Sequence, residues 1–289
     1  MVSNRRKLRA FLIVLTVLSL AGCADSRTEG SVTPESPYNM FLQKFQSENP
    51  DIHGVDMVSL ADKYIRRLEN DATRSDYITN VNYSVERCNF SQKDADYCDD
   101  LVITIDTQHN SDIYDKTLIC IFVSEGGGNY KNVLLEGYWE QYLYPGKPVV
   151  EYELINVTGD GKSQIRLTMI TGYTEYTTKR MQLLAYNEGR KEMSIIFNEI
   201  VYSDLFISYI SSEEEKYRIR CDNEYQFVPI PSGGCDILLN TRIYERDHEE
   251  RVLESGSTRF TYNGTQYVPD GAYYDYQVRA QRIQARGKS

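Results

Sequence analysis

The arrangement of apolar and polar positions divides the chain into stretches of different kinds. An apolar run covers residues 10–20, and an almost wholly polar stretch follows it at 24–38. We predict a helical segment over 39–78, because apolar residues recur there at helical spacing, on positions 57, 58, 60, 61, 64, 65 and 68. From residue 79 onward the pattern changes to short apolar or alternating runs bounded by polar turns, which is typical of strands.

The strand-like runs follow one another at close spacing as far as residue 270. Their connections are too short for the crossovers that regular parallel units need. We therefore predict a mainly β fold with an N-terminal helix, in which antiparallel sheets over 79–270 form a curved sandwich or a partial propeller-like repeat. The polar C-terminal tail at 271–289 has the composition of a frayed helix. The predicted strands are 80–85, 100–106, 117–123, 149–157, 164–171, 180–186, 193–197, 205–210, 216–220, 236–244, 257–262 and 266–268.

The first residues follow the plan of a secretory signal peptide. Basic residues precede the apolar run, which is shorter than the roughly 20 apolar residues that a membrane-spanning helix needs. The run ends in Leu20-Ala21-Gly22-Cys23, which resembles the bacterial lipobox. The resemblance implies a signal peptide at 1–22, cleavage just before Cys23, and a lipid with palmitate-type acyl chains on the Cys23 thiol. An ordinary secretory signal is the alternative.

Residues 23–38 predict a flexible, lipidated tether, because they are too polar to bury a core. The lipobox resemblance further implies an exported protein that its lipid anchors to a membrane, at the cell surface. In a Gram-negative host we expect the outer membrane, because Ala24 stands where many inner-membrane lipoproteins of such hosts carry an aspartate. The membrane is thus the partner to which the N-terminal sequence points.

Composition excludes some partners and leaves others open. The formal charge of the chain is −10, and it becomes −14 without residues 1–22, which hold four basic residues and no acidic ones. Such a charge argues against binding to nucleic acid or to an anionic lipid surface. The chain has 24 tyrosines against 9 phenylalanines, which suits the half-buried faces of strands. Stacking on sugars is the alternative use of a tyrosine-rich face.

Four of the five cysteines after Cys23 flank short polar loops in pairs. In an exported protein such pairs are typical of disulfides, each of which would stabilise the fold by about 2–3 kcal/mol. Zinc is the rival interpretation, but the chain has no CxxC motif and no histidine near the pairs. Cys120 lies in an apolar run and is expected to be a buried thiol. The disulfide candidates are Cys88 with Cys98, and Cys221 with Cys235.

Residues 154–197 begin with the segment LINVTGDGKSQI, which resembles the calcium loop between two strands of FG-GAP/VCBS-type repeats. The resemblance implies propeller-like sheets that bind protein or sugar partners, without catalysis in most copies. Since calcium affinity depends on the number of carboxylates, and most acids of the motif are replaced here, we expect a loop that has kept its turn and lost its ion. The degenerate calcium-loop positions are Asn156, Thr158, Asp160 and Gln164.

No catalytic centre is visible in the sequence, and we name no catalytic residue. The chain lacks the GxSxG and HExxH motifs, and its histidines lie in polar loops. We therefore favour a non-catalytic binding or scaffold lipoprotein with a protein or glycan partner. The alternative is an extracytoplasmic hydrolase that acts on glycans through acids in the 151–250 region, since paired carboxylates need to meet only in three dimensions.

Overall fold

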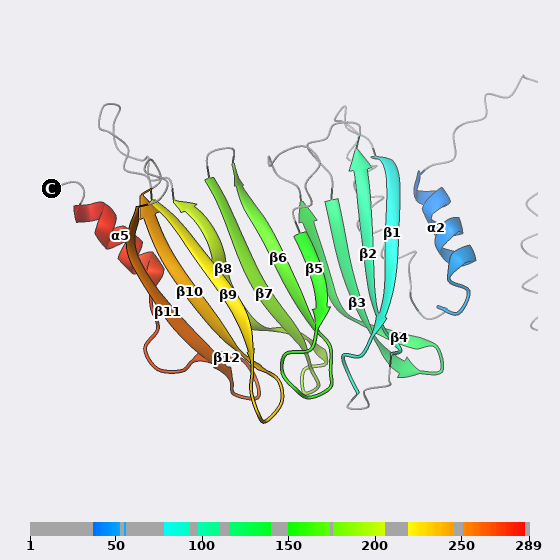
Figure 1. The fold of residues 1–289 in the computed structure, drawn as a ribbon. Helices are drawn as coiled ribbons and strands as arrows, with labels where there is room; N and C mark the ends of the chain where they lie inside the picture. The colour runs from blue at the N-terminus through cyan, green and yellow to red at the C-terminus, as the bar shows by residue number, and fades with distance from the viewer. Residues whose placement is uncertain are drawn as a thin grey trace, which may run out of the picture. The chain divides into compact units, whose positions relative to one another are not determined.

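The computed structural model of the chain describes residues 37–52, 55, 78–92, 98–109, 116–139, 150–173, 176–205, 219–245 and 251–286. These residues are mainly β, with antiparallel strands and a helix near the N-terminus (Figure 1), so the predicted fold class is confirmed. The helical stripe at 57–68, the signal-peptide segment and Cys23 lie outside the described residues. None of the described helices has the length and apolar character needed to cross a membrane.

The described strands form two sheets in which each strand lies beside the next one in the chain. One sheet has four strands in the order β1-β2-β3-β4, and the other has eight in the order β5 to β12. Helix α2 (Pro37–Glu48) precedes the first sheet, and helix α5 (Tyr276–Arg286) follows the second. The strands are β1 (Ile78–Cys88), β2 (Asp100–His109), β3 (Lys116–Gly126), β4 (Asn129–Trp139), β5 (Val150–Ile155), β6 (Gln164–Tyr173), β7 (Tyr176–Asn187), β8 (Glu192–Leu205), β9 (Ile219–Pro229), β10 (Cys235–Glu245), β11 (Val252–Tyr262) and β12 (Tyr267–Pro269).

The eight-stranded sheet divides into two halves at β8 and β9. These two strands pair only where Tyr202–Leu205 meets Ile219–Asp222, whereas β9 and β10 pair along their whole length. The described strands therefore make three successive four-stranded meanders. We call β1–β4 meander 1, β5–β8 meander 2 and β9–β12 meander 3.

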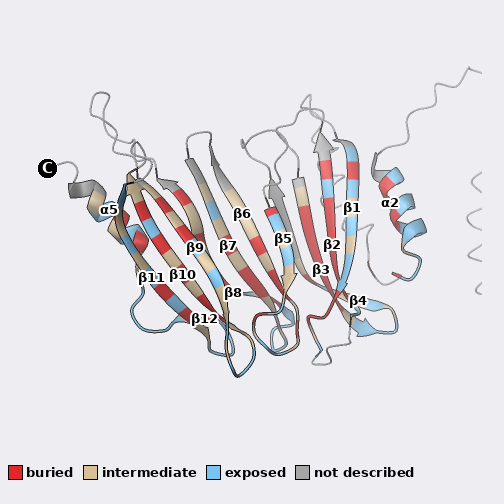
Figure 2. Ribbon diagram, viewed as in Figure 1, coloured by how far each residue is buried: buried red, intermediate tan, exposed pale blue. Residues whose placement is uncertain are grey.

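The three meanders pack face to face, because both faces of meander 2 are apolar. Ile165 and Leu167 of one face share a buried cluster with Val102 and Ile121 of meander 1. Residues of the opposite face share a second cluster with meander 3, and Figure 2 shows buried positions on strands of all three meanders. This alternation follows from the period of two along a strand. The second cluster includes Met181, Leu183, Phe197, Ile237, Leu239 and Phe260.

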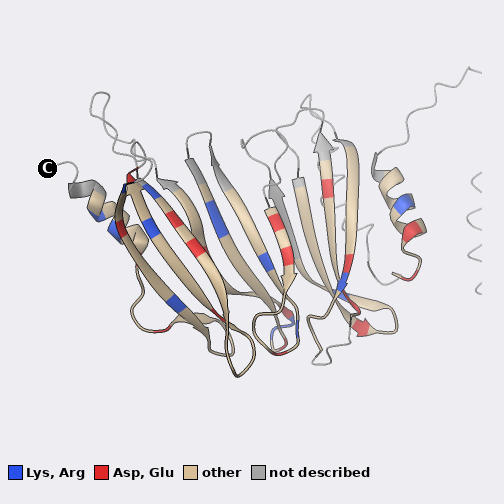
Figure 3. Cartoon of the chain, in the orientation of Figure 1, with Lys and Arg blue, Asp and Glu red and all other residues tan. Residues whose placement is uncertain are grey.

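The two ends of the stack are closed in different ways. Phe41 and Phe45 of α2 pack on the face of meander 1 that points away from meander 2. Strands β9, β10 and β11 of meander 3 instead carry charged residues (Figure 3). The strand register puts the exposed Glu224, Arg242 and Arg259 on the far face of meander 3. Stacked repeats need such a polar outer face on the last copy to stay soluble.

Two strands were largely missed by the sequence patterns. In the pairing of β4 with β3 a register shift leaves Val133 without a partner, and this extra residue interrupts the period of two along β4 on which strand prediction depends. Only the start of β9 was predicted, because two of the residues on its buried side are Cys221 and Asn223, which do not form an apolar alternation.

The predicted disulfide between Cys221 and Cys235 is wrong. In the β9–β10 hairpin Cys221 lies opposite Ile243, while Cys235 lies opposite Pro229. The two cysteines are thus eight residues apart along either strand, about 26 Å at the usual rise of a strand. A disulfide requires Cα atoms within about 7 Å.

Cys88 and Cys98 are also free thiols in the structure, rather than the predicted disulfide. Cys88 is buried at the end of β1, where its Sγ donates to the carbonyl oxygen of Asp100 at 3.6 Å, and Cys98 is exposed. Cys120 is buried in β3, as predicted, and burial raises the pKa of its thiol to about 12.

Candidate functional site

The loop that resembles a calcium site, residues 156–163, is filled by a side-chain amide. Gln164 is buried, and its Oε1 accepts the backbone N–H of Val157 at 2.8 Å. Its Nε2 donates to Thr158 Oγ1 at 2.9 Å and to the carbonyl oxygen of Lys162 at 2.8 Å. The Gln164 amide therefore binds loop oxygens through hydrogen bonds. In a calcium loop the cation binds such oxygens instead.

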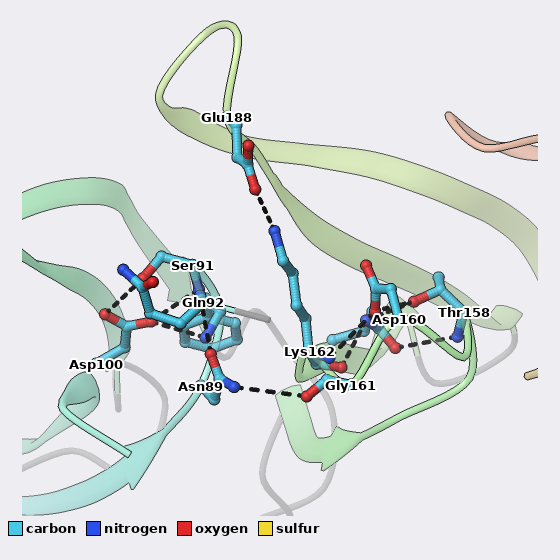
Figure 4. A network of polar contacts seen from close by, with 11 residues as sticks. Asn89, Ser91, Gln92, Asp100, Thr158, Asp160, Gly161, Lys162 and Glu188 are labelled. Carbon is cyan, nitrogen blue, oxygen red and sulfur yellow. Dashed lines mark hydrogen bonds and ion pairs between the residues drawn. The ribbon is translucent and has the colours of Figure 1, made fainter. Parts of the chain in front are cut away.

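The remaining acid of the loop already accepts hydrogen bonds from the chain. Asp160 Oδ1 accepts the Thr158 hydroxyl at 2.7 Å and the Lys162 N–H at 3.1 Å (Figure 4). Calcium takes about 6–8 oxygen ligands, several of them carboxylates, whereas the described residues contain no group of three His, Cys, Asp or Glu that could hold a metal. These residues do not fit a calcium site, although the loss of the ion stays a prediction.

Two glycines, Gly159 of the loop and Gly234 just before β10, allow a close approach between the loop and meander 3. A Cβ on Gly159 would lie 2.5 Å from the backbone N of Gly234, and one on Gly234 would lie 2.8 Å from the carbonyl carbon of Thr158. Across this contact the N–H of Cys235 donates to the carbonyl oxygen of Val157 at 2.8 Å. Only glycine permits such proximity at positive φ.

The same loop also contacts meander 1. The N–H of Ser163 donates to the carbonyl oxygen of Asn89 at 2.5 Å, and Asn89 Nδ2 donates to the carbonyl oxygen of Gly161 at 3.5 Å (Figure 4). Buried Lys162 forms an ion pair with Glu188 in the turn after β7. The calcium-like loop is therefore a junction that holds the three meanders together.

Each meander has a buried acceptor at the start of its second strand. Asp100 begins β2, and its carboxylate accepts the N–H groups of Phe90 at 2.7 Å, Ser91 at 2.9 Å and Ser124 at 2.8 Å. Gln164 begins β6, and in meander 3 Asp236 accepts two hydrogen bonds from an arginine on β11. The equivalence can be read in the sequence, where each acceptor precedes an apolar residue in the pairs Asp100-Leu101, Gln164-Ile165 and Asp236-Ile237.

A groove with a volume of about 470 Å³ opens between β8 and the β11–β12 hairpin. Its floor is aromatic: the Phe197 ring packs edge-on against Phe260 at 5.1 Å and Tyr267 at 6.0 Å, measured between centroids. Ile195, of which 52% is exposed, and Tyr273 leave further apolar surface open to water beside it. Exposed apolar surface in a concave site is typical of a place where a partner binds.

Glu199 is the charged residue among those that line the groove. Its carboxylate accepts the hydroxyl of Tyr273 at 3.3 Å. Burial raises the pKa of Glu199, because the charged form loses water. The hydrogen bonds from Tyr273 and Tyr276 and the charge of Arg180 lower this pKa, and the nearby Asp275 raises it. The groove thus offers one acid, one aromatic floor and amide groups.

The sequence patterns did not indicate this groove, since its residues come from β8, from β11 and β12, and from the segment before α5. The abundance of tyrosine was the available signal. No family of known proteins, no curated protein and no solved structure matches the chain.

Proposed function

We propose that this chain is a membrane-anchored extracytoplasmic lipoprotein that binds a partner in the groove beside β8 and performs no chemistry there. The groove carries the proposal, because it combines an aromatic floor and exposed apolar surface with a single lining carboxylate. The lipobox ending in Cys23 supports the anchor. The stacked meanders support a binding role, since they provide a rigid frame for the groove.

A photo-crosslinking amino acid at position 195 tests the groove in cells. Val252 is the matched control, because it is an apolar β-strand residue that is 47% exposed, against 52% for Ile195, and lies outside the groove. We expect position 195 to capture a defined partner that position 252 does not capture, and Tyr273→Ala to reduce that capture. Equal capture from both positions would refute the groove as the binding site.

The anchor has a separate test. Cys23→Ser should abolish labelling by a radioactive fatty acid, and should leave the precursor uncut or release the protein from the membrane fraction. Cys98→Ser is the control, because that thiol is exposed and far from the signal segment in sequence. Labelling that survives Cys23→Ser contradicts the lipobox interpretation.

The hydrolase alternative is supported by one observation. Glu199 lies in a groove with aromatic walls and has a raised pKa, as a general acid of a glycosidase does. This alternative predicts cleavage of cell-wall or polysaccharide substrates that Glu199→Gln abolishes and that the exposed control Glu224→Gln leaves intact. If none of these substrates is cleaved, the hydrolase alternative is excluded.

A further inference from the structure

We infer that the partner in this groove is an extended peptide that adds as a strand to the free edge of β8, with an apolar side chain on the aromatic floor and a basic side chain facing Glu199. The inference rests on the proposed function and names the class of partner. Two observations carry it: the pairing of β8 and the sequence of residues that line the groove.

Over most of its length β8 has a neighbour on one side only. Residues 192–201 pair with β7, while within the described chain β9 joins β8 only from Tyr202 onward. The carbonyl oxygen of Ile200 accepts Asn223 Nδ2 at 2.6 Å, so among the described residues the sheet edge runs over 192–199. An edge presents N–H and C=O groups that another strand can pair with.

The groove follows this edge, not a face of the sheet. Five successive residues of β8, Ile195–Glu199, line it. Since successive side chains of a strand point to opposite faces, a pocket on one face would be lined by alternate residues. Despite a register shift within this stretch, Ile195 lies opposite Leu184 and Phe197 opposite Leu183, which belong to different faces of meander 2. Since residues of both faces line it, the groove runs beside the backbone.

The opposite wall of the groove is also at a strand edge. β12 pairs with β11 alone in the described sheet, and Gln266, Tyr267 and Pro269 line the groove from that side. Residues 195–199 contain no lysine and no proline, two of the features that block such an edge against pairing, but they include a register shift and the charged Glu199. The groove thus has the form of a slot beside a strand edge, as in domains that bind peptides by strand addition.

Side chains at the slot define the chemistry of the peptide. Phe197, Phe260 and Tyr267 form an apolar floor, which favours an aliphatic or aromatic residue. Glu199 is acidic, and the chain as a whole has a formal charge of −10, which favours a basic residue. A peptide strand with an apolar residue on the floor and a lysine or arginine facing Glu199 meets both of these preferences.

The first experiment is selection from a phage-displayed library of short random peptides on the detergent-solubilised full chain. Counter-selection uses Ile195→Lys, which places a blocking charge on the edge, and Val252→Lys is the matched control. We expect enriched peptides to alternate apolar and polar residues, to contain a basic residue, and to bind the control as tightly as the unchanged protein. Peptides that bind Ile195→Lys equally well, or no enrichment at all, would overturn the inference.

The second experiment separates backbone pairing from side-chain binding and needs no protein variant. Methylating alternate backbone nitrogens of an enriched peptide removes the donors of one edge, so affinity should fall at least about tenfold in one of the two methylation registers. Glu199→Gln should weaken a lysine peptide about threefold and leave its threonine analogue unchanged. Methylated peptides that bind undiminished in both registers overturn strand addition. If crosslinking at position 195 still captures a partner, the groove remains a binding site for another ligand; if it does not, the proposed function fails as well.

Discussion

The β1–β2 loop and the β5–β6 loop each need an acceptor for a backbone N–H group, and they use different side chains for it. Both begin with an asparagine, an apolar residue and a hydroxyl residue, Asn89-Phe90-Ser91 in one and 156–158 in the other. In both, the backbone N–H of the apolar residue donates to the first side chain of the next strand. That side chain is the carboxylate of Asp100 in meander 1 and the amide of Gln164 in meander 2.

The difference decides what each loop needs from its surroundings. A carboxylate only accepts hydrogen bonds, so Asp100 collects backbone N–H groups from two segments, at Phe90 and Ser91 and at Ser124. An amide also donates, so Gln164 can bond loop oxygens as well. The β5–β6 loop therefore forms hydrogen bonds within itself, and its Gly159 contacts meander 3.

The largest expected effect is the loss of the Asp100 carboxylate. Asp100→Ala leaves three backbone donors without their acceptor, and we expect the free energy of unfolding to fall by about 4 kcal/mol. Equilibrium unfolding in urea measures the change. Asp99→Ala is the control, because Asp99 is exposed, and should have almost no effect. A loss for Asp100→Ala below about 1 kcal/mol would show that the network is not stabilising.

Replacement of Gly159 should have the next largest effect and tests the contact between the β5–β6 loop and meander 3. Gly159→Ala should cost about 3 kcal/mol, because the new Cβ adds an overlap to the strain of a positive φ. Gly128→Ala isolates the strain, since Gly128 has φ +80° against +78° for Gly159 and no atom within 4 Å of an added Cβ. We expect about 1 kcal/mol there. Equal losses of stability in the two variants would mean that the β5–β6 loop moves to make room for the added Cβ at no further cost.

Gln164→Glu makes the β5–β6 loop resemble the β1–β2 loop in charge. It removes two donated hydrogen bonds and buries a carboxylate near Asp160, so it should cost about 2 kcal/mol at neutral pH. Millimolar calcium should raise the melting temperature of this variant, since the ion binds the folded state alone, and adding Asp160→Asn should abolish the rise. The unchanged protein should show no calcium effect. A calcium-dependent rise in the unchanged protein would restore the metal-site interpretation.

The smallest expected effect concerns Lys162 and its ion pair. The side chain of Lys162 is 10% exposed, while that of Glu188 is 62% exposed. Because the exposed Glu188 keeps its contact with water, removing Lys162 leaves no buried charge unpaired, so Lys162→Met should change the free energy of unfolding by less than about 0.5 kcal/mol. A thermal melt compares it with Lys179→Met on the exposed surface of β7. A large loss would mean that the ion pair, rather than the Gln164 amide, holds the loop.

Part of this structure could be predicted from the sequence because the relevant patterns are local. Alternation and short connections predicted a mainly β, antiparallel fold with a helix near the N-terminus, and the helix is found at Pro37–Glu48. The buried thiol at Cys120 followed from an apolar run. A register shift at Val133 obscured the alternation of β4. The predicted pairing of Cys221 with Cys235 was wrong because loop length does not fix where two residues lie along a hairpin.

The sequence by itself determined the period-two faces of the strands, the antiparallel order and the lipobox-like N-terminus, since each depends on neighbouring residues. Only the tertiary structure decided that meanders 1, 2 and 3 stack, that the calcium-like loop joins them, and that within the described residues β8 has β7 alone beside it over 192–199. These features depend on where β8 separates from β9 and on the meeting of Phe197 with Phe260, which are distant along the chain. Local periodicity records which face of a strand is buried, but not which distant strand covers it.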